Sequence, residues 1–132
     1  MIVVDTNVIA YLLIGGEKTP HARALFQKDS KWVAPILWRS EFRNVLAYYL
    51  RQRKLVLSDA LQLMNEAELL FQDEEYQVDS GHVLGLVSSS RCSAYDCEFI
   101  GLAQHLGLSL VTSDKQLLTE FPDTTVSLDS FG

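Results

Sequence analysis

Ile2-Val3-Val4-Asp5-Thr6-Asn7 is the stretch that decides the fold of this chain. Its three apolar residues run directly into a carboxylate, which is typical of a short buried strand that ends at Asp5. A helical pattern of apolar residues follows at once, over residues 8–13. Asp5 is therefore expected at the carboxyl end of a central parallel strand, where open α/β sheets bind ligands. A carboxylate in that place needs a proton, a cation or hydrogen-bond donors.

The rest of the chain alternates between strand and helix patterns. Alternation of this kind predicts an α/β fold, a three-layer α/β/α sandwich around a mainly parallel sheet of about four to five strands. Residues 1–132 are expected to form a single domain. Strands are predicted at 2–4, 32–35, 76–78, 108–112 and 124–128, and helices at 7–14, 19–27, 37–53, 58–72, 80–87, 94–106 and 115–120. In the helix at 58–72, the residues expected to face inward are Leu61, Met64 and Phe71.

The composition of the chain argues against several classes of protein. No apolar run is long enough to span a membrane, and the first apolar run lacks the basic region of a signal peptide. Cys92 and Cys97 give no disulfide framework and no second metal-type pair, so we expect a cytoplasmic protein. The net charge of −6 argues against broad, unspecific binding of nucleic acid, although a nuclease with an acidic metal site is compatible with it.

Positive charge is unevenly distributed. Five of the eleven basic residues fall between positions 39 and 54. This cluster is either a solvated helix face or a contact strip for phosphates or an acidic partner. Its members are Arg39, Arg43, Arg51, Arg53 and Lys54.

Four acidic residues stand in places that suggest chemistry. Asp5 and Asp114 each follow an apolar strand, whereas Glu41 and Asp96 each lie within an apolar helical stretch. Each also has a structural explanation, because Asp is a favoured helix cap, Ser93-x-x-Asp96 resembles a capping box, and Glu is a good helix former. If these four carboxylates lie close together in the fold, they require either raised pKa values or a bound cation. Hard oxygen ligands without clustered His or Cys favour Mg²⁺ or Mn²⁺ over zinc.

The segments around these four acids resemble the PIN domain. They are Ile-Val-Val-Asp-Thr-Asn at 2–7, the helical Glu41, Ser-Ala-Tyr-Asp at 93–96 and Leu-Val-Thr-Ser-Asp at 110–114. The resemblance covers residues 2–128, and in size and layout it is nearest to the VapC-like toxins of type II toxin–antitoxin pairs. One departure is Cys97, where the family commonly has a small residue, and a free cysteine behaves as a small hydrophobe.

The resemblance implies a metal-dependent endoribonuclease. Asn7 and Thr112 match the polar residues that support the acidic site of the family through hydrogen bonds. A bound Mg²⁺, or Mn²⁺ in its place, would activate a water that attacks the phosphodiester bond of RNA. The catalytic and metal-binding quartet of the family corresponds to Asp5, Glu41, Asp96 and Asp114.

The same resemblance implies partners. A VapC-like toxin has a small cognate antitoxin and forms a homodimer, for which the helices within residues 37–72 are the candidate surfaces. Trp38, Tyr48 and Tyr49 would suit an interface core or, equally, the core of the monomer.

Other functions fit the sequence less well. A receiver-like, Mg²⁺-binding phosphotransfer domain would need an adjacent acidic pair after the first strand, which carries only Asp5. A haloacid-dehalogenase-like phosphatase would need an aspartate at the position of Asn7. A non-catalytic PIN-like binding module would have no need for four mutually repelling carboxylates.

Overall fold

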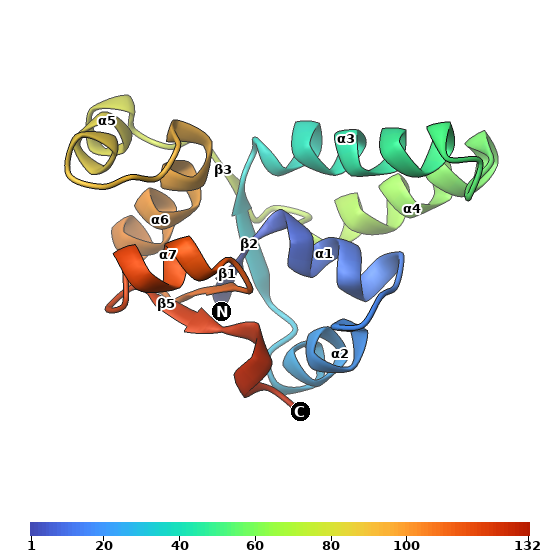
Figure 1. The fold of residues 1–132 in the computed structure, drawn as a ribbon, viewed down its shortest axis with the longest axis horizontal. Coiled ribbons are helices and arrows are strands. Elements are labelled where there is room, and N and C mark those ends of the chain that lie inside the picture. The colour runs from blue at the N-terminus through green and yellow to red at the C-terminus, as the bar shows by residue number, and fades with distance from the viewer.

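The computed structural model describes residues 1–132 and has a five-stranded parallel sheet with β1 (Ile2–Val4) at its centre (Figure 1). The strand order is β3-β2-β1-β4-β5. The predicted α/β class and parallel sheet are thereby confirmed. The other strands are β2 (Trp32–Pro35), β3 (Glu75–Tyr76), β4 (Leu110–Thr112) and β5 (Thr125–Ser127).

The helices begin and end close to where the apolar periodicity places them. Three predicted strand ends were wrong: the strand predicted at 76–78 ends at Tyr76, the strand predicted at 108–112 begins at Leu110, and Leu128, predicted as strand, starts a short 3₁₀ helix. The elements are α1 (Thr6–Leu13), α2 (Thr19–Lys28), α3 (Trp38–Arg51), α4 (Leu57–Leu70), α5 (Ser80–Ser88), α6 (Ala94–Leu106), α7 (Lys115–Glu120) and η1 (Leu128–Ser130).

Strand order reverses at β1, which pairs with β2 on one side and β4 on the other. Val4 is opposite Val111, so the next residues of the two strands, Asp5 and Thr112, follow side by side. A reversal of strand order opens a crevice at the carboxyl ends of the strands. The fold therefore places the end of β1 in the crevice where open α/β sheets bind ligands.

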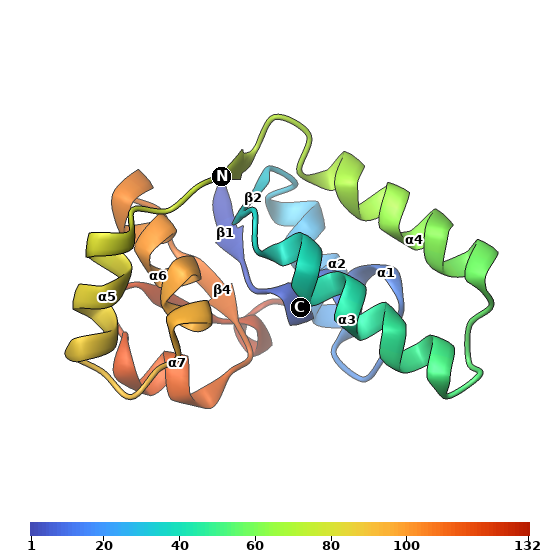
Figure 2. The same cartoon turned by 90° about the horizontal axis from the view of Figure 1, so that it is seen from above.

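Helices cover both faces of the sheet (Figures 1 and 2). On one side α6 packs on β1, β2 and β4, with α5 outside it, and on the other side α1 packs on β4, with α2 alongside. Five consecutive residues of α6, 99–103, are buried, and Gly107 ends that helix in the left-handed conformation with φ of 67°. A single core of 27 buried residues joins the layers.

The antiparallel pair α3 and α4 extends away from the sheet (Figure 2). Its base is anchored by Trp38, which is fully buried and stacks against Phe71 with ring centroids 4.8 Å apart. Trp38 is therefore monomer core, whereas Tyr48 is 56% exposed. The inward position predicted for Leu61 is wrong, because the buried stripe of α4 runs through Ala60 and Ala67 and leaves Leu61 57% exposed.

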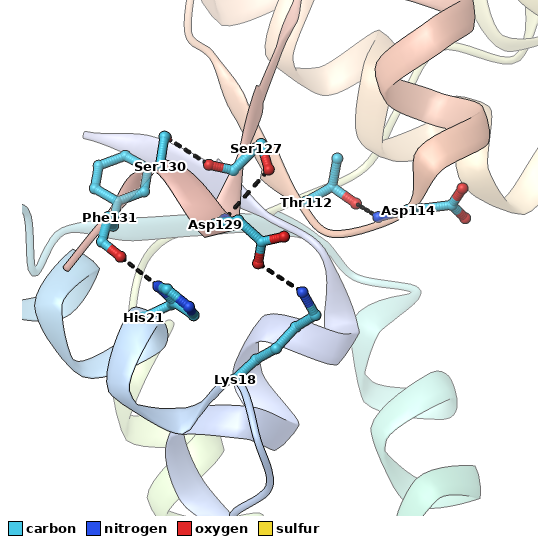
Figure 3. A network of polar contacts seen from close by, with 8 residues as sticks. All are labelled: Lys18, His21, Thr112, Asp114, Ser127, Asp129, Ser130 and Phe131. Atoms are coloured by element: carbon cyan, nitrogen blue, oxygen red, sulfur yellow. Dashed lines mark hydrogen bonds and ion pairs between the residues drawn. The ribbon is translucent and has the colours of Figure 1, made fainter.

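The last residues of the chain are tied to α2 (Figure 3). Lys18 Nζ lies 2.6 Å from Asp129 Oδ1, and the ring Nδ1 of His21 contacts the carbonyl oxygen of Phe131. These contacts hold η1 against α2. Separately, no helix of the structure combines the length and the apolar character that a membrane crossing requires.

The base of α3 is also fixed by an ion pair whose stability contribution we expect to depend on pH. Arg39 donates to both carboxylate oxygens of Glu75, at 2.6 and 2.7 Å, and Trp38 Nε1 donates to the same carboxylate at 2.8 Å. The hydrogen bonds from Arg39, with a smaller part from Trp38, lower the pKa of Glu75. A lowered pKa stabilises the fold above the pKa of the unfolded chain, and this stabilisation disappears as the pH falls through the folded-state pKa.

Glu75→Gln should therefore lower the free energy of unfolding at pH 7 by about 1 kcal/mol. At a low pH, below the lowered folded-state pKa of Glu75, the difference should shrink. Urea denaturation at both pH values measures it, with the exposed Glu17→Gln as the matched control. A difference of the same size at both pH values would show that the charge of Glu75 is not responsible.

Candidate metal centre

Asp5, Glu41, Asp96 and Asp114 all lie at the carboxyl edge of the sheet. Asp5 follows β1 directly, and Asp114 lies two residues beyond β4. Glu41 lies in the first turn of α3, which leaves the end of β2. Asp96 lies in the first turn of α6, which runs back toward the start of β4. Four segments far apart in the sequence thus contribute one carboxylate each to the same edge.

Asp5 is held by two hydrogen bonds. Its Oδ1 accepts from the backbone N of Thr6 at 2.8 Å, so the side chain caps α1. Its Oδ2 accepts from the hydroxyl of Thr112 at 2.8 Å. The capping explanation is therefore correct, and the same carboxylate also faces the neighbouring strand.

Thr6 links two of the acids, a role that the sequence did not reveal. Its hydroxyl donates to Glu41 Oε1 at 2.7 Å, and its side chain is almost fully buried. Glu41 is 35 residues away in the sequence, so no local spacing could have suggested this bond. Thr6 fixes the direction of Glu41 toward the end of β1.

Asp114 caps the helix that follows it. Its Oδ1 accepts from the backbone N of Gln116 and of Leu117, at 2.8 and 3.3 Å. The Thr112 hydroxyl accepts from the backbone N of Asp114 at 3.0 Å (Figure 3). The same hydroxyl donates to Asp5. Through these two hydrogen bonds the hydroxyl of Thr112, a fully buried residue, connects the ends of β1 and β4.

Asp96 is held less tightly than the other three acids. Ser93 caps α6 by accepting from the Asp96 backbone N at 3.1 Å, which is one half of the expected capping box. Asp96 is half-buried and forms no ion pair. Unlike the other three acids, its carboxylate accepts no hydrogen bond from a backbone N–H or a threonine hydroxyl.

Burial and mutual repulsion raise the pKa of three of these acids. The pKa of Asp5 is raised by burial and further by Asp96 and Asp114, against the hydrogen bonds from Thr112 and Thr6. The pKa of Glu41 is raised by burial and then by Asp5, Asp96 and Glu98, and that of Asp96 by burial and then by Asp114. Glu98, whose pKa burial also raises, is a fifth acid near the site that the sequence analysis missed.

None of the four acids is neutralised by a cationic side chain. The five ion pairs of the chain all lie elsewhere. Nor do any three His, Cys, Asp or Glu side chains gather closely enough to hold a metal ion by themselves. A site of oxygen donors without a closed protein cage is compatible with a hydrated Mg²⁺, because that ion keeps several waters and is usually held by only one or two carboxylates plus substrate phosphate.

Two further residues singled out in the sequence, Asn7 and Arg39, form no hydrogen bond or ion pair with the four acids. Asn7 is exposed, and its side chain makes no hydrogen bond to the four acids, so its supporting role stays a prediction. Arg39, two positions before Glu41, turns away from the site to pair with Glu75.

Comparisons with known proteins identify the family of the chain. The profile of the PIN domain family matches residues 2–122, and the chain belongs to that family. No curated protein has a matching sequence.

Solved structures share the fold at low sequence identity. PAE2754 from Pyrobaculum aerophilum has a TM-score of 0.77 at 19% identity, covering 98% of this chain and 91% of its own. A toxin–antitoxin complex from Klebsiella pneumoniae has a TM-score of 0.70 at 12% identity, covering 97% and 98%. FitAcB from Neisseria gonorrhoeae has a TM-score of 0.66 at 19% identity, covering 88% and 89%.

Removing one of the repelling charges should stabilise the protein in the absence of metal. Because the folded-state pKa of Asp96 is raised, its ionisation opposes folding once the pH exceeds the pKa of the unfolded chain. Asp96→Asn should therefore raise the free energy of unfolding at pH 7 in EDTA by about 0.5–1 kcal/mol. The gain should vanish at pH 3, where the wild-type carboxyl is protonated in both states.

Urea denaturation with and without Mg²⁺ tests this expectation. The exposed Asp123→Asn is the matched control, since it removes the same charge away from the site. Mg²⁺ should stabilise the wild type more than Asp96→Asn, because binding to the folded state alone raises stability. A variant less stable than wild type at pH 7 in EDTA would mean that Asp96 is held by favourable contacts rather than strained by repulsion.

Proposed function

We propose that this PIN domain is a Mg²⁺-dependent endoribonuclease and the toxin of a type II toxin–antitoxin pair. The observation that carries the proposal is the cluster of four carboxylates at the strand-order reversal, with no cationic partner in the chain. Burial, and then mutual repulsion, raise the pKa values of Asp5, Glu41 and Asp96, so their ionisation opposes folding at neutral pH, which suggests a use that requires a cation.

The acidic residues and the two threonines would have different roles in this reaction. Asp5, Asp96 and Asp114 would hold Mg²⁺, or Mn²⁺ in its place, directly or through water, and Glu41 would hold the ion or orient the attacking water. When bound, such an ion lowers the pKa of a ligand water and screens the charge on phosphate oxygens. Thr112 and Thr6 keep Asp5 and Glu41 in position, because hydrogen-bonded carboxylates cannot swing away from the site.

The toxin assignment draws on the shared fold of a toxin–antitoxin complex from Klebsiella pneumoniae. By analogy, the partner would be a small antitoxin protein, and the chain would form a homodimer in the cytoplasm. Exposed apolar residues along the α3–α4 pair, including Leu57, Leu61 and Leu69, give such partners a surface to cover.

A non-catalytic PIN-like binding module is the second candidate function. The burial of Thr6 and Thr112, each of which hydrogen-bonds a site carboxylate, argues against it. Groups that serve only to hold carboxylates in place have little purpose in a surface that merely binds. A receiver-like phosphotransfer domain is set aside, because the chain belongs to the PIN family.

RNA cleavage should depend on both Asp5 and the divalent cation. Wild-type protein should cleave members of a panel of structured and unstructured RNAs in Mg²⁺ or Mn²⁺ and not in EDTA. Asp5→Asn should lower the rate at least about a hundredfold, because it removes a ligand charge and keeps the shape of the side chain. The matched control Asp123→Asn should cleave like wild type.

Gel analysis of end-labelled RNA distinguishes the outcomes. Equal cleavage by wild type and Asp5→Asn would point to a contaminating nuclease and exclude the catalytic assignment. Binding of RNA without cleavage by any protein would favour the binding module.

Expression in bacteria tests the toxin assignment separately. Induction of the wild-type chain alone should arrest growth, and induction of Asp5→Asn at the same level should not, because arrest would result from RNA cleavage. Growth curves with immunoblots of both proteins measure this. Unchanged growth with a wild-type protein that cleaves RNA in vitro would indicate a housekeeping nuclease.

A further inference from the structure

The loop before α6 is tied to α7 through one residue, Arg91. The backbone N of Arg91 donates to Glu120 Oε1 at 3.2 Å, and its carbonyl oxygen accepts from Gln116 Nε2 at 3.3 Å. Gln116 and Glu120 are four residues apart on α7, so both side chains lie on the same face of that helix. The two peptide groups that flank Arg91 are therefore held by two neighbouring side chains of α7.

These two hydrogen bonds link the segments that carry Asp96 and Asp114. Asp96 belongs to the loop and helix at 89–106, and Asp114 to the strand and helix at 110–121. No other hydrogen bond joins residues 89–106 to residues 110–121. Apart from the packing of α6 on the sheet, the spacing of the two acids therefore depends on the contacts of Arg91.

Gln116 binds to both sides of this link. Its backbone N donates to Asp114 Oδ1 at 2.8 Å, while its side-chain amide donates to the carbonyl oxygen of Arg91. Asp114 is itself fixed to the end of β4, because its backbone N donates to the hydroxyl of Thr112. A single residue thus connects the carboxylate of Asp114 to the loop that leads to Asp96.

The short segment between Arg91 and Asp96 is held in a defined conformation. Ser93 caps α6 by accepting from the backbone N of Asp96 at 3.1 Å. Cys92, directly before the cap, and Cys97, the fourth residue of the helix, are both buried. Apolar side chains at these two positions pack together and fix the direction in which the chain enters a helix. The position of Arg91 therefore determines where α6 begins and where Asp96 lies.

Repulsion between the acids opposes this arrangement. After burial, Asp114 is the next cause of the raised pKa of Asp96, so the two carboxylates lie close enough to repel each other. The carboxylate of Asp96 accepts no hydrogen bond within the chain, and neither does Oδ2 of Asp114. The repulsion would move the two acids apart, and the hydrogen bonds to Arg91 resist that movement.

We propose that Gln116 and Glu120 are positioning residues that hold Asp96 at a spacing from Asp114 that a divalent cation can bridge. The proposal rests on the proposed nuclease function and assigns two residues of α7 to it. Removing a group that orients carboxylate ligands typically weakens metal binding at least about tenfold. The hydrogen bonds to Arg91 act through the backbone rather than on the ligand oxygens, so we expect a smaller effect.

Binding of Mn²⁺ alone tests the spacing. Gln116→Met keeps the length of the side chain, removes the donor to Arg91, and should weaken binding about three- to tenfold. Glu120→Met should do the same, whereas Glu120→Gln keeps an acceptor for Arg91 and should bind like wild type. The loss of the electron paramagnetic resonance signal of free Mn²⁺ measures the affinity. The matched control is Gln104→Met, which removes a hydrogen-bonded amide at the other end of α6.

Cleavage of RNA gives a second readout. Gln116→Met should need about three- to tenfold more Mg²⁺ for half-maximal cleavage and should reach nearly the wild-type rate when Mg²⁺ saturates. A residue that only supports the fold of α7 would not change the Mg²⁺ requirement. A lower rate at saturating Mg²⁺, with an unchanged half-maximal concentration, would overturn the positioning role.

Unfolding by urea in EDTA tests the restraint without metal. When the contact with Arg91 is broken, Asp96 and Asp114 can move apart, and the relieved repulsion offsets part of the lost hydrogen bond. Gln116→Met should therefore lower the urea midpoint less in the wild-type background than in the Asp96→Asn background, where there is no repulsion to relieve.

The outcomes separate this proposal from the proposed function. Equal affinity of wild type and Gln116→Met for Mn²⁺ overturns the proposal, and so do equal shifts of the urea midpoint in both backgrounds. Weakened binding by Glu120→Gln overturns the role of Glu120, because its charge and not its hydrogen bond would then matter. A wild-type protein that binds no Mn²⁺ refutes the proposed nuclease, and the urea midpoints alone then decide whether α7 restrains Asp96.

Discussion

Repulsion among carboxylates that no basic residue of the chain neutralises is the constraint on which the site depends. Asp5 ends the central strand, and its hydrogen bonds from Thr6 and Thr112 hold it in place without cancelling its charge. Burial and the neighbouring acids raise the pKa of Asp5, Glu41 and Asp96, so the protein alone keeps these groups at a cost in stability. A hydrated divalent cation would relieve that cost, and such an ion can activate the water that hydrolyses a phosphodiester bond. The same buried carboxylates thus lower the stability of the protein and would bind the cation for the proposed reaction.

The sheet provides the means to bring the acids together. Because all five strands are parallel and the order reverses at β1, the carboxyl ends of β1 and β4 adjoin, and the helices that start or finish there add their own side chains. Two threonines then fix the positions of individual acidic residues through hydrogen bonds. Thr112 bonds to both Asp5 and the backbone of Asp114, and Thr6 bonds to Glu41.

Sequence patterns predicted the fold well, because strand runs such as Ile2–Val4 and the helical periodicity of residues 94–106 are local signals. They also placed Asp5 and Asp114 at one edge of the sheet, since a residue after a parallel strand has only one edge to occupy. Glu41 and Asp96 were grouped with these two acids through the resemblance to the PIN domain. Contacts between distant segments were not readable. Thr6 finds its partner 35 residues away, and Glu98 approaches Glu41 from another helix. Leu61 was misplaced because periodicity gives the spacing of an apolar stripe but not its rotation about the helix axis.

The pairing of β1 with β4 also determines when the site can exist. Asp5 and Thr112 are 107 residues apart, so their hydrogen bond closes nearly the whole chain into a loop. During synthesis the first strand emerges long before the fourth, and contacts of such high sequence separation form slowly. Asp114 lies two residues beyond β4 and is therefore made after it. A nascent chain that ends before β4 therefore has no assembled acidic centre, because Asp114 and the Thr112 hydroxyl that holds Asp5 are still missing.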